Sequence, residues 1–353
     1  MVLSPLTLTL SPKGRGQIRI DNSQGIKRRI FMKRCSSILT ISVSVMLWLL
    51  AGVAVAAEKY PSRPINLIVG FSPGGASDLG SKVLADKMAE FLGQPLVSIY
   101  KPGGGGALAA SFLAKAKPDG YNVLVMASFM NLPPEIKKLD YKLDDFILTG
   151  IYSRAPYFVI VKADARWKNF QELAAEAKES PGKLSYGTAG VNTGGHFVHE
   201  LLAKSSGVKI NHVPFKSCPD AFTAMLGGHI DVYICVGAGA SFEPRAVRVL
   251  ATAESKRLEG LPNVPTLTEL GYPAFFTTWY SFAVPKGTPP PIVEALTEAQ
   301  GKALEKYGKE IEEGLRRVEM WPMFLDRQRS LQEFKTQYDT LRELAGPTGP
   351  GGK

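Results

Sequence analysis

The chain has few of the residues from which metal sites and nucleophilic active sites are built. Only four histidines and three cysteines occur among its 353 residues. His196 and His199 stand three positions apart beside Glu200, but this is not the H-E-x-x-H motif, and no third metal ligand is obvious. No G-x-S-x-G motif occurs either. The sequence therefore predicts neither a metal site nor a nucleophilic enzyme.

Nucleotide-binding glycine motifs are also missing. A P-loop needs Lys followed by Ser or Thr after its last glycine, whereas Gly75 is followed by Ala76, Ser77 and Asp78. The G-x-G-x-x-G fingerprint of dinucleotide-binding folds is absent from the first strand-to-helix turn, where it would be needed. We therefore expect no nucleotide, and no other cofactor is indicated.

A long apolar run occurs only at the N-terminus. Residues 38–56 are almost entirely apolar, follow Lys33 and Arg34, and lead into small residues that end at Ala57. This arrangement predicts a secretory signal peptide that ends near Ala57, and thus export to the periplasm. Because the run approaches the ~20 residues that span a bilayer, an uncleaved membrane anchor is the alternative. Met1 and Met32 are both candidate start residues.

Positive charge is concentrated in this leader. The first 57 positions hold eight of the 42 basic residues but one of the 32 acidic residues, so 34 basic and 31 acidic residues remain. The formal net charge falls from +10 for the whole chain to +3 for the rest. A nucleic-acid-binding function loses its main support. The remaining 296 residues suit two domains, and we expect them to be soluble and monomeric.

Two cysteines remain beyond the leader, Cys218 and Cys235. Each ends a predicted strand, and export permits disulfide formation, so a bond between neighbouring strand ends is one interpretation. Two unpaired thiols are the favoured interpretation, because disulfide geometry cannot be inferred from sequence. The redox state of the pair stays open at this point.

Strand-like and helix-like segments alternate along the rest of the chain, which predicts an α/β fold with mostly parallel sheets. Apolar runs predict strands at 66–71, 95–100, 122–127, 156–162, 184–187, 211–215, 231–236, 247–253 and 279–285. Helices are predicted at 79–92, 107–115, 169–179, 195–205, 219–226, 290–307 and 330–344. We expect one lobe from 58–155 with 281–345, a second lobe from 156–280, chain crossings near 155 and 280, and a disordered tail at 346–353.

Three glycine-rich loops join predicted strands to the helices that follow, at 72–78, 101–106 and 187–195. Glycine allows the backbone to approach a ligand closely, and the free N–H groups at a helix start attract anions. Ligands of open α/β sheets bind beyond the carboxyl ends of the strands, where all three loops lie. Tight turns alone would explain any one loop, but three long loops favour a binding cleft.

Short motifs occur in a fixed order from about residue 60 to the end of the last predicted helix. They are Phe71-Ser72-Pro73-Gly74-Gly75 with Asp78, Lys101-Pro102-Gly103-Gly104-Gly105-Gly106, Lys117-Pro118-Asp119-Gly120-Tyr121, Val213-Pro214-Phe215-Lys216, Leu226-Gly227-Gly228, Val264-Pro265-Thr266-Leu267-Thr268-Glu269-Leu270-Gly271-Tyr272-Pro273 and Ala283-Val284-Pro285-Lys286-Gly287-Thr288-Pro289. This ordered set resembles the substrate-binding proteins of tripartite tricarboxylate transporters, the TctC or Bug family.

The resemblance implies a two-lobed periplasmic-binding-protein (Venus-flytrap) fold that closes on a small carboxylate, an organic acid or related anion. Delivery of this ligand to inner-membrane permease subunits is implied as well. The positions that the loops and the resemblance indicate for ligand binding are Ser72, Gly74, Gly75, Asp78, Gly104, Gly105, Gly106, Ala107, Ser128, Thr188, Asn192, Thr193, His196, Lys216 and Trp279.

Some of these positions also have a purely structural interpretation. Asp78 stands where a helix N-cap belongs, and it could also hold a water beside the ligand. His196 suits a hydrogen-bond donor at a helix start facing the cleft. Trp279 and Tyr280 either pack in the core or form an aromatic wall.

The chain departs from the family pattern in the run Phe215-Lys216-Ser217-Cys218-Pro219-Asp220, where a Pro-Tyr-Lys-Gly-like sequence is common. Tyr100 replaces a common Asn, and Ala109 a usual glycine. No familiar ligand is therefore inferred for this chain.

Three other functions compete with transport. A ligand sensor for a signalling partner would use the same cleft. A periplasmic enzyme acting on a small acid would need two titratable groups within reach of each other, for which Asp78 and His196 are the candidates. A membrane-tethered interaction protein would need mature material that begins at residue 32 or earlier.

Overall fold

The structure is a computed structural model that describes residues 60–133, 136–237 and 245–345. The predicted signal peptide, its end near Ala57 and the predicted tail at 346–353 lie outside these ranges. No helix in the described ranges combines the length and apolar character needed to cross a bilayer. The elements below all belong to one compact unit, Lys59–Lys353.

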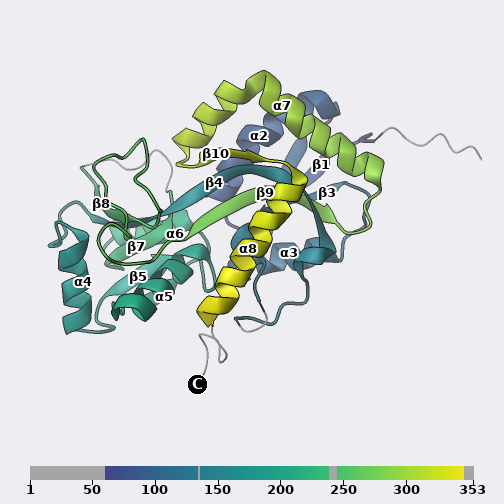
Figure 1. Cartoon of the computed structure of the whole chain (residues 1–353). Coiled ribbons are helices and arrows are strands. Elements are labelled where there is room, and N and C mark those ends of the chain that lie inside the picture. The colour runs from purple at the N-terminus through teal and green to yellow at the C-terminus, as the bar shows by residue number, and fades with distance from the viewer. Residues whose placement is uncertain (1–59, 134–135, 238–244, 346–353) are drawn as a thin grey trace, which may run out of the picture. The chain divides into compact units, whose positions relative to one another are not determined.

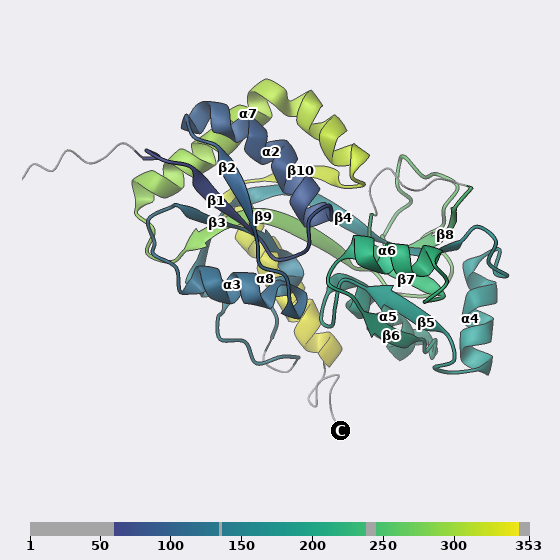
Figure 2. The ribbon, with the colours of Figure 1, turned by 180° about the vertical axis from the view of Figure 1, so that it is seen from behind.

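Three parallel strands begin the fold. β1 (Ile65–Val69) lies between β2 (Leu96–Tyr100) and β3 (Asn122–Ala127). The connecting helices α2 (Ala76–Leu92) and α3 (Ala107–Ala114) lie on opposite faces of these strands, as Figure 2 shows. Right-handed crossovers require this arrangement when strands are added on both sides of β1. Four of the five β1 residues are buried, because helices cover both faces.

A second parallel set has the same plan. β5 (Ser185–Thr188) lies between β6 (Asn211–Pro214) and β7 (Val232–Val236). Helix α5 (Gly194–Ser206) connects β5 to β6, and α6 (Cys218–Leu226) connects β6 to β7. All five residues of β7 are buried. Helix α4 (Phe170–Glu179) precedes β5.

One long strand joins the two sets (Figure 1). The first part of β4 (Phe146–Lys162) pairs with β9 (Thr277–Pro285) and β10 (Trp321–Leu325), and its last part with β7 and β8 (Val247–Thr252). These pairs are antiparallel, unlike the strand pairs within the two three-stranded sets. The strand order is β2-β1-β3-β9-β4-β7-β5-β6, with β8 and β10 also paired to β4.

The partners of β4 change at a single peptide bond. Pro156 is opposite Thr277 of β9, and the next residue, Tyr157, is opposite Val236 of β7. This change lies one residue beyond the predicted chain crossing near 155. The limits of the two lobes themselves stay a prediction.

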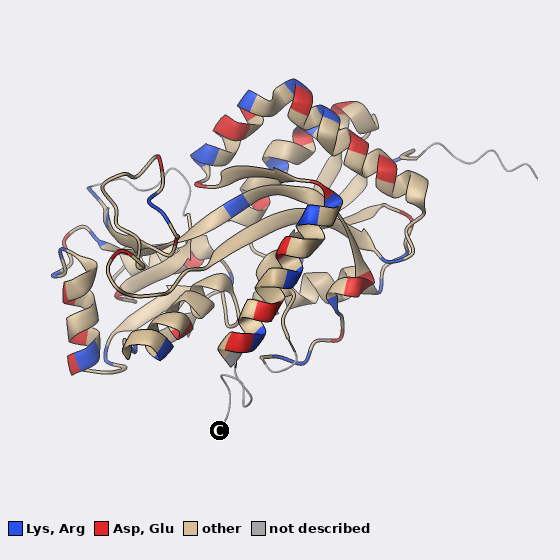
Figure 3. Ribbon diagram, viewed as in Figure 1, with Lys and Arg blue, Asp and Glu red and all other residues tan. Residues whose placement is uncertain are grey.

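Two C-terminal helices pack on this framework. α7 (Pro290–Arg317) packs along α2, and α8 (Arg327–Ala345) packs against β4. The backbone of α7 is non-helical at Tyr307 (φ −117°, ψ 18°), where the sequence predicted the helix to end. Figure 3 shows charged residues of both signs along these helices and few on β4 and β9. This contrast is expected of amphipathic helices that cover a buried sheet.

The predicted elements are present, but several of their bounds differ, and further elements occur. α2 begins at Ala76, three residues before the predicted start. β4 begins at Phe146, ten residues before the predicted strand, and β10 was not predicted. Short 3₁₀ turns at Gly104–Gly106 (η1), Ser128–Met130 (η2) and Leu143–Asp145 (η3) were not predicted either.

We predict that Leu67→Ala in the middle of β1 lowers the free energy of unfolding by about 2–5 kcal/mol, because Leu67 is fully buried and its loss leaves a cavity. Chemical denaturation measures the change. Val97→Ala on β2, where the side chain is 46% exposed, is the matched control and should shift stability by less than about 0.5 kcal/mol. Equal effects of the two substitutions would contradict the assignment of β1 to the core.

Candidate functional site

A cavity lies between the two parallel sets. On the side of the first set its wall consists of Phe71, Gly75, Ala76, Ser77 and Phe129. These residues follow the carboxyl ends of β1 and β3 or begin α2. The rings of Phe71 and Phe129 meet edge to face, with centroids 6.0 Å apart. The cavity thus lies where ligands of open α/β sheets bind.

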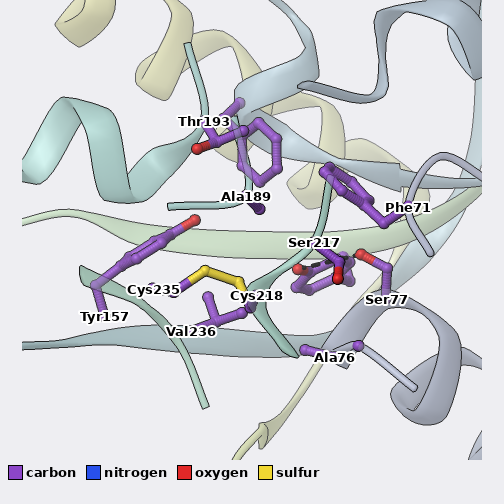
Figure 4. Close-up of a pocket in the computed structure, with 13 residues that line it drawn as sticks. Phe71, Ala76, Ser77, Tyr157, Ala189, Thr193, Ser217, Cys218, Cys235 and Val236 are labelled. Carbon is purple, nitrogen blue, oxygen red and sulfur yellow. Dashed lines mark hydrogen bonds between the residues drawn. A yellow bond between two sulfur atoms is a disulfide. The ribbon is translucent and has the colours of Figure 1, made fainter. Parts of the chain in front are cut away.

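The second set supplies the opposite wall, shown in Figure 4. Its residues follow β5, begin α5 and α6, or end β7: Ala189, Thr193, Ser217, Cys218, Cys235 and Val236. The hydroxyl of Thr193 donates to the Gly190 carbonyl (2.7 Å), and that of Ser217 to the Asp220 carboxylate (2.8 Å). Both hydroxyl hydrogens of this wall are therefore engaged by the protein.

Two tyrosines from the crossing strands complete the wall, Tyr157 of β4 and Tyr280 of β9. The hydroxyl of Ser77 donates to Tyr280 (3.4 Å), and Tyr157 shares a hydrogen bond with Thr278 (2.6 Å). Burial raises the pKa of Tyr280 to about 12 and that of Tyr157 well above its usual range, so both phenols are neutral near pH 7. The described wall contains no Asp, Glu, Lys, Arg or His.

The start of α2 presents free donors to the cavity. Gly75 is the N-cap, with extended backbone (φ −80°, ψ 169°) and no side-chain hydrogen bond. The N–H groups of Gly75, Ala76 and Ser77 find no acceptor among the described residues. Because these groups are also the positive end of the helix dipole, this part of the wall favours an anion.

Asp78 holds the loop that precedes α2. It is not the predicted N-cap; it lies in the first turn, because the helix begins at Ala76. Its carboxylate is 2% exposed and accepts from the Gly74 N–H (2.9 Å) and the Tyr100 hydroxyl (3.0 Å). It also pairs with Lys82 (2.8 Å). Although burial opposes it, hydrogen bonds to Asp78 and Tyr100 raise the pKa of Lys82. Asp78 thus fixes the loop through three groups and does not line the cavity.

The second glycine loop closes against the second set. All of residues 103–106 have positive φ, which glycine adopts without strain. A Cβ on Gly105 would lie 3.0 Å from the Val191 carbonyl oxygen and 3.3 Å from Cγ2 of Thr193. The loop therefore contacts the 190–193 segment directly, and only glycine allows this approach.

A histidine behind the 188–195 loop holds its first residue. Thr188 is fully buried, and its hydroxyl bonds to the N–H and carbonyl of Gly190 and lies 2.7 Å from Nε2 of His212. Asn192 at the loop tip has φ 61°, a left-handed conformation that Asn tolerates. The loop shape thus depends on His212.

His196 faces a cluster of rings rather than the cavity. Its ring centroid lies 4.7 Å from that of His212, and Tyr186 stacks between His212 (4.8 Å) and His199 (4.3 Å). Burial lowers the pKa of His196. Burial and the neighbouring imidazoles lower the pKa of His212 to about 4. Among the described residues, no group of three or more His, Cys, Asp or Glu could hold a metal ion.

Three further predicted positions lie away from the cavity wall. Lys216 is exposed. Ser128 is buried and its hydroxyl accepts from the Trp279 N–H (3.1 Å), so these two residues tie η2 to β9. Trp279 is half-buried and does not line the cavity, whereas the adjacent Tyr280 does.

Cys218 and Cys235 form a disulfide, with their Cα atoms 5.9 Å apart. The favoured interpretation of two unpaired thiols was therefore wrong. The bond forms because Cys218 begins α6 and Cys235 lies in β7, two elements that pack together but whose approach the sequence does not reveal. Figure 4 shows the disulfide in the wall between Tyr157 and Ser217.

Of the fifteen predicted ligand-binding positions, the structure places Gly75 and Thr193 in the cavity wall. Others shape its surroundings: Gly74 and Asp78 fix the first loop, Gly105 contacts the opposite loop, and Thr188 supports it. Lining residues that sequence reasoning missed are mostly apolar or aromatic, and in the sequence they look like core residues. The remaining predicted positions do not line the cavity: Ser72, Gly104, Gly106, Ala107, Ser128, Asn192, His196, Lys216 and Trp279.

Known proteins are similar to this chain in both sequence and fold. The chain is 36% identical over 281 residues to the UPF0065 protein in the gbd 5′ region of Cupriavidus necator, covering 78% of this chain and 84% of that protein. BugD, a periplasmic binding protein, matches with TM-score 0.76 and 28% identity over 81% of this chain and 97% of BugD.

Two ligand-bound structures from Rhodopseudomonas palustris are also similar. One contains adipate, and the other is MatC with bound malate. Each matches with TM-score 0.74 and 25% identity over 81% of this chain, and over 97% and 99% of the respective structure.

The strand order, the cavity between the two sets and these neighbours define a two-lobed solute-binding protein, which confirms the predicted fold. The model of the tripartite tricarboxylate transporter family receptor, TctC, matches residues 81–343. The chain belongs to this family, as the resemblance in its motifs predicted.

We predict that reducing the disulfide lowers the free energy of unfolding by about 2–4 kcal/mol, because the bond closes a loop between residues 17 positions apart. Denaturant unfolding with and without reductant measures the change. The double variant Cys218→Ala/Cys235→Ala is the control and should be insensitive to reductant. A wild type that ignores reductant would refute the disulfide.

We predict that stability falls as the pH drops from about 6.5 towards 4. The pKa of His212 is lower in the folded protein than its usual 6.5, so the unfolded chain binds an extra proton in this window. His212→Gln should weaken this pH dependence. Denaturant unfolding at pH 7, 6 and 5 measures how the free energy of unfolding changes with pH. His229→Gln, at an exposed position, is the control and should behave like the wild type. If the free energy of unfolding of His212→Gln changes with pH as steeply as that of the wild type, this prediction is wrong.

Proposed function

We propose that the protein captures a small carboxylate between two lobes and delivers it to a tripartite tricarboxylate-type transporter. The observation that carries this proposal is the start of α2, where three N–H groups without acceptors among the described residues belong to residues that line the cavity. The described part of the cavity wall has no ionised side chain. A carboxylate satisfies these donors and the positive end of the helix dipole together. Family membership and the malate and adipate of the neighbouring structures support the same ligand class.

In this proposal, residues 58–155 and 281–345 form one lobe and residues 156–280 the other. The hinge lies in β4 and β9, where the pairing passes from Pro156 to Tyr157. The loop 72–78 holds the carboxylate, with Asp78 fixing its shape. Contact between the loop at 104–107 and the loop at 188–193 then marks the closed state, in which Gly105 meets Val191.

The proposal places the working protein in the periplasm. The apolar leader with its small-residue end supports export, and the disulfide between Cys218 and Cys235 fits an oxidising compartment. The competing enzyme hypothesis gains no support, because neither Asp78 nor His196 lines the cavity. A permease is the partner to which the family name points.

Ala76→Pro tests the carboxylate grip. Ala76 is the first residue of α2, a position that suits proline, and the extended backbone of Gly75 suits a residue before proline. The substitution removes one N–H donor while the helix remains. We expect carboxylate affinity, measured by calorimetry, to fall roughly tenfold or more, since hydrogen bonds to charged groups contribute about 1.5–3 kcal/mol.

Ala76→Gly keeps the N–H and is the matched control, which should bind within about threefold of wild type. Thermal unfolding of both variants checks that α2 is intact. The proposal fails if no member of an organic-acid panel raises the Tm of the wild type and protein purified from the periplasm carries no acid by native mass spectrometry. It also fails if Ala76→Pro binds carboxylates as well as Ala76→Gly.

A further inference from the structure

The phenol of Tyr280 reaches the cavity from the centre of the sheet. β9, the strand that carries it, runs between β3 and β4, and Tyr280 is 2% exposed. Its ring lies beside that of Tyr152, with centroids 6.4 Å apart. Its hydroxyl lies 3.4 Å from the hydroxyl of Ser77 in the first turn of α2, and both residues line the cavity. The core therefore fixes this hydroxyl next to the start of α2.

The hydrogen of the Tyr280 hydroxyl is not used by the described protein. In the bond between the two hydroxyls, Ser77 donates and the Tyr280 oxygen accepts. No acceptor for the Tyr280 hydrogen occurs in the part of the chain that the structure describes. Burial raises the pKa of Tyr280 to about 12, so the hydrogen is present near pH 7. Because a buried donor without an acceptor is costly, we expect a group in the cavity to accept from it.

The other polar groups of the wall differ from Tyr280. The hydroxyls of Thr193 and Ser217 donate to groups of the protein. Tyr157 and Thr278 share a hydrogen bond in which either hydroxyl can donate. The N–H groups of Thr193, Ser217 and Cys218 find no acceptor among the described residues, so the second wall has backbone donors of its own. What Tyr280 adds is a side-chain donor on the α2 side of the cavity.

Tyr280 and the start of α2 together present four donors. They are the N–H groups of Gly75, Ala76 and Ser77 and the hydroxyl of Tyr280. An ionised carboxylate only accepts hydrogen bonds, at about four positions on its two oxygens. Ser77 joins the two kinds of donor, since its N–H belongs to the helix start and its hydroxyl holds the Tyr280 oxygen. The number of donors thus matches one carboxylate.

We infer that the Tyr280 hydroxyl donates a hydrogen bond to the carboxylate held at the start of α2, and that Ser77 is the residue that positions this hydroxyl. The inference rests on the proposed function, since it assumes that α2 holds the carboxylate. An O–H group that donates to a carboxylate forms a short and strong hydrogen bond. Tyr280 is therefore a ligand-binding residue and not only part of an aromatic wall.

Tyr280→Phe tests the inference by calorimetry with butanoate, succinate, adipate and benzoate. Each acid that binds the wild type should bind this variant roughly tenfold or more weakly, because one hydrogen bond to a charged group is lost. Tyr152→Phe is the matched control: Tyr152 lies beside Tyr280 but does not line the cavity, so affinity should change by less than about twofold. Thermal unfolding checks that both variants fold.

Equal affinities of Tyr280→Phe and Tyr152→Phe overturn the inference and leave the proposed function intact. If none of the four acids binds the wild type, the proposed function itself is contradicted, and the inference with it. Proton NMR of the wild type gives a readout that does not depend on a variant's stability. The Tyr280 hydroxyl proton should shift downfield when an acid binds, as expected for a donor to a carboxylate. A bound acid that leaves this proton unshifted also overturns the inference.

Ser77→Ala tests the positioning role. This substitution keeps the N–H donor and removes the hydroxyl that holds the Tyr280 oxygen. We expect about threefold weaker binding of the acids in the wild-type background and no further loss in the Tyr280→Phe background, since the two residues act as one unit. A loss of equal size in both backgrounds shows that Ser77 does not act through Tyr280, and the positioning role is then wrong.

Discussion

The pairing of β4 is the constraint on which the rest of the structure depends. This strand pairs with β9 and β10 over its first part and with β7 and β8 over its last part, so one continuous backbone belongs to both halves. The carboxyl ends of the parallel strands face each other because β4 aligns them. A break near Pro156 would leave two small sheets without a common cavity.

Order around the cavity comes from side chains that do not line it. Asp78 joins the first loop to β2 through Tyr100 and to α2 through Lys82. On the other side, His212 supports the second loop through Thr188. Both supports are half-buried or buried, where polar contacts are worth more than in water. The cavity can therefore present mostly backbone and apolar groups and still keep a defined shape.

Sequence patterns predicted the fold better than the wall of the site. The apolar runs of β1, β3 and β7 and the loops between them were recognisable, because strand periodicity and glycine are local signals. The first ten residues of β4 were not, since Gly150 and Arg154 interrupt the apolar run. Tyr157 and Tyr280 look like core residues in sequence, and the disulfide requires a through-space approach of α6 and β7. Predictions from loops thus found the surroundings of the cavity rather than its lining.

The absence of a side chain at Gly105 has a consequence for affinity. In the proposed closing motion, the Gly105 backbone must approach the Val191 carbonyl closely. The side chain of any larger residue at this position would collide with that carbonyl and hinder closure. The fraction of molecules able to close multiplies the intrinsic affinity of the site. A position that the ligand never touches can therefore tune how much solute the protein retains, while the choice between solutes stays with the wall.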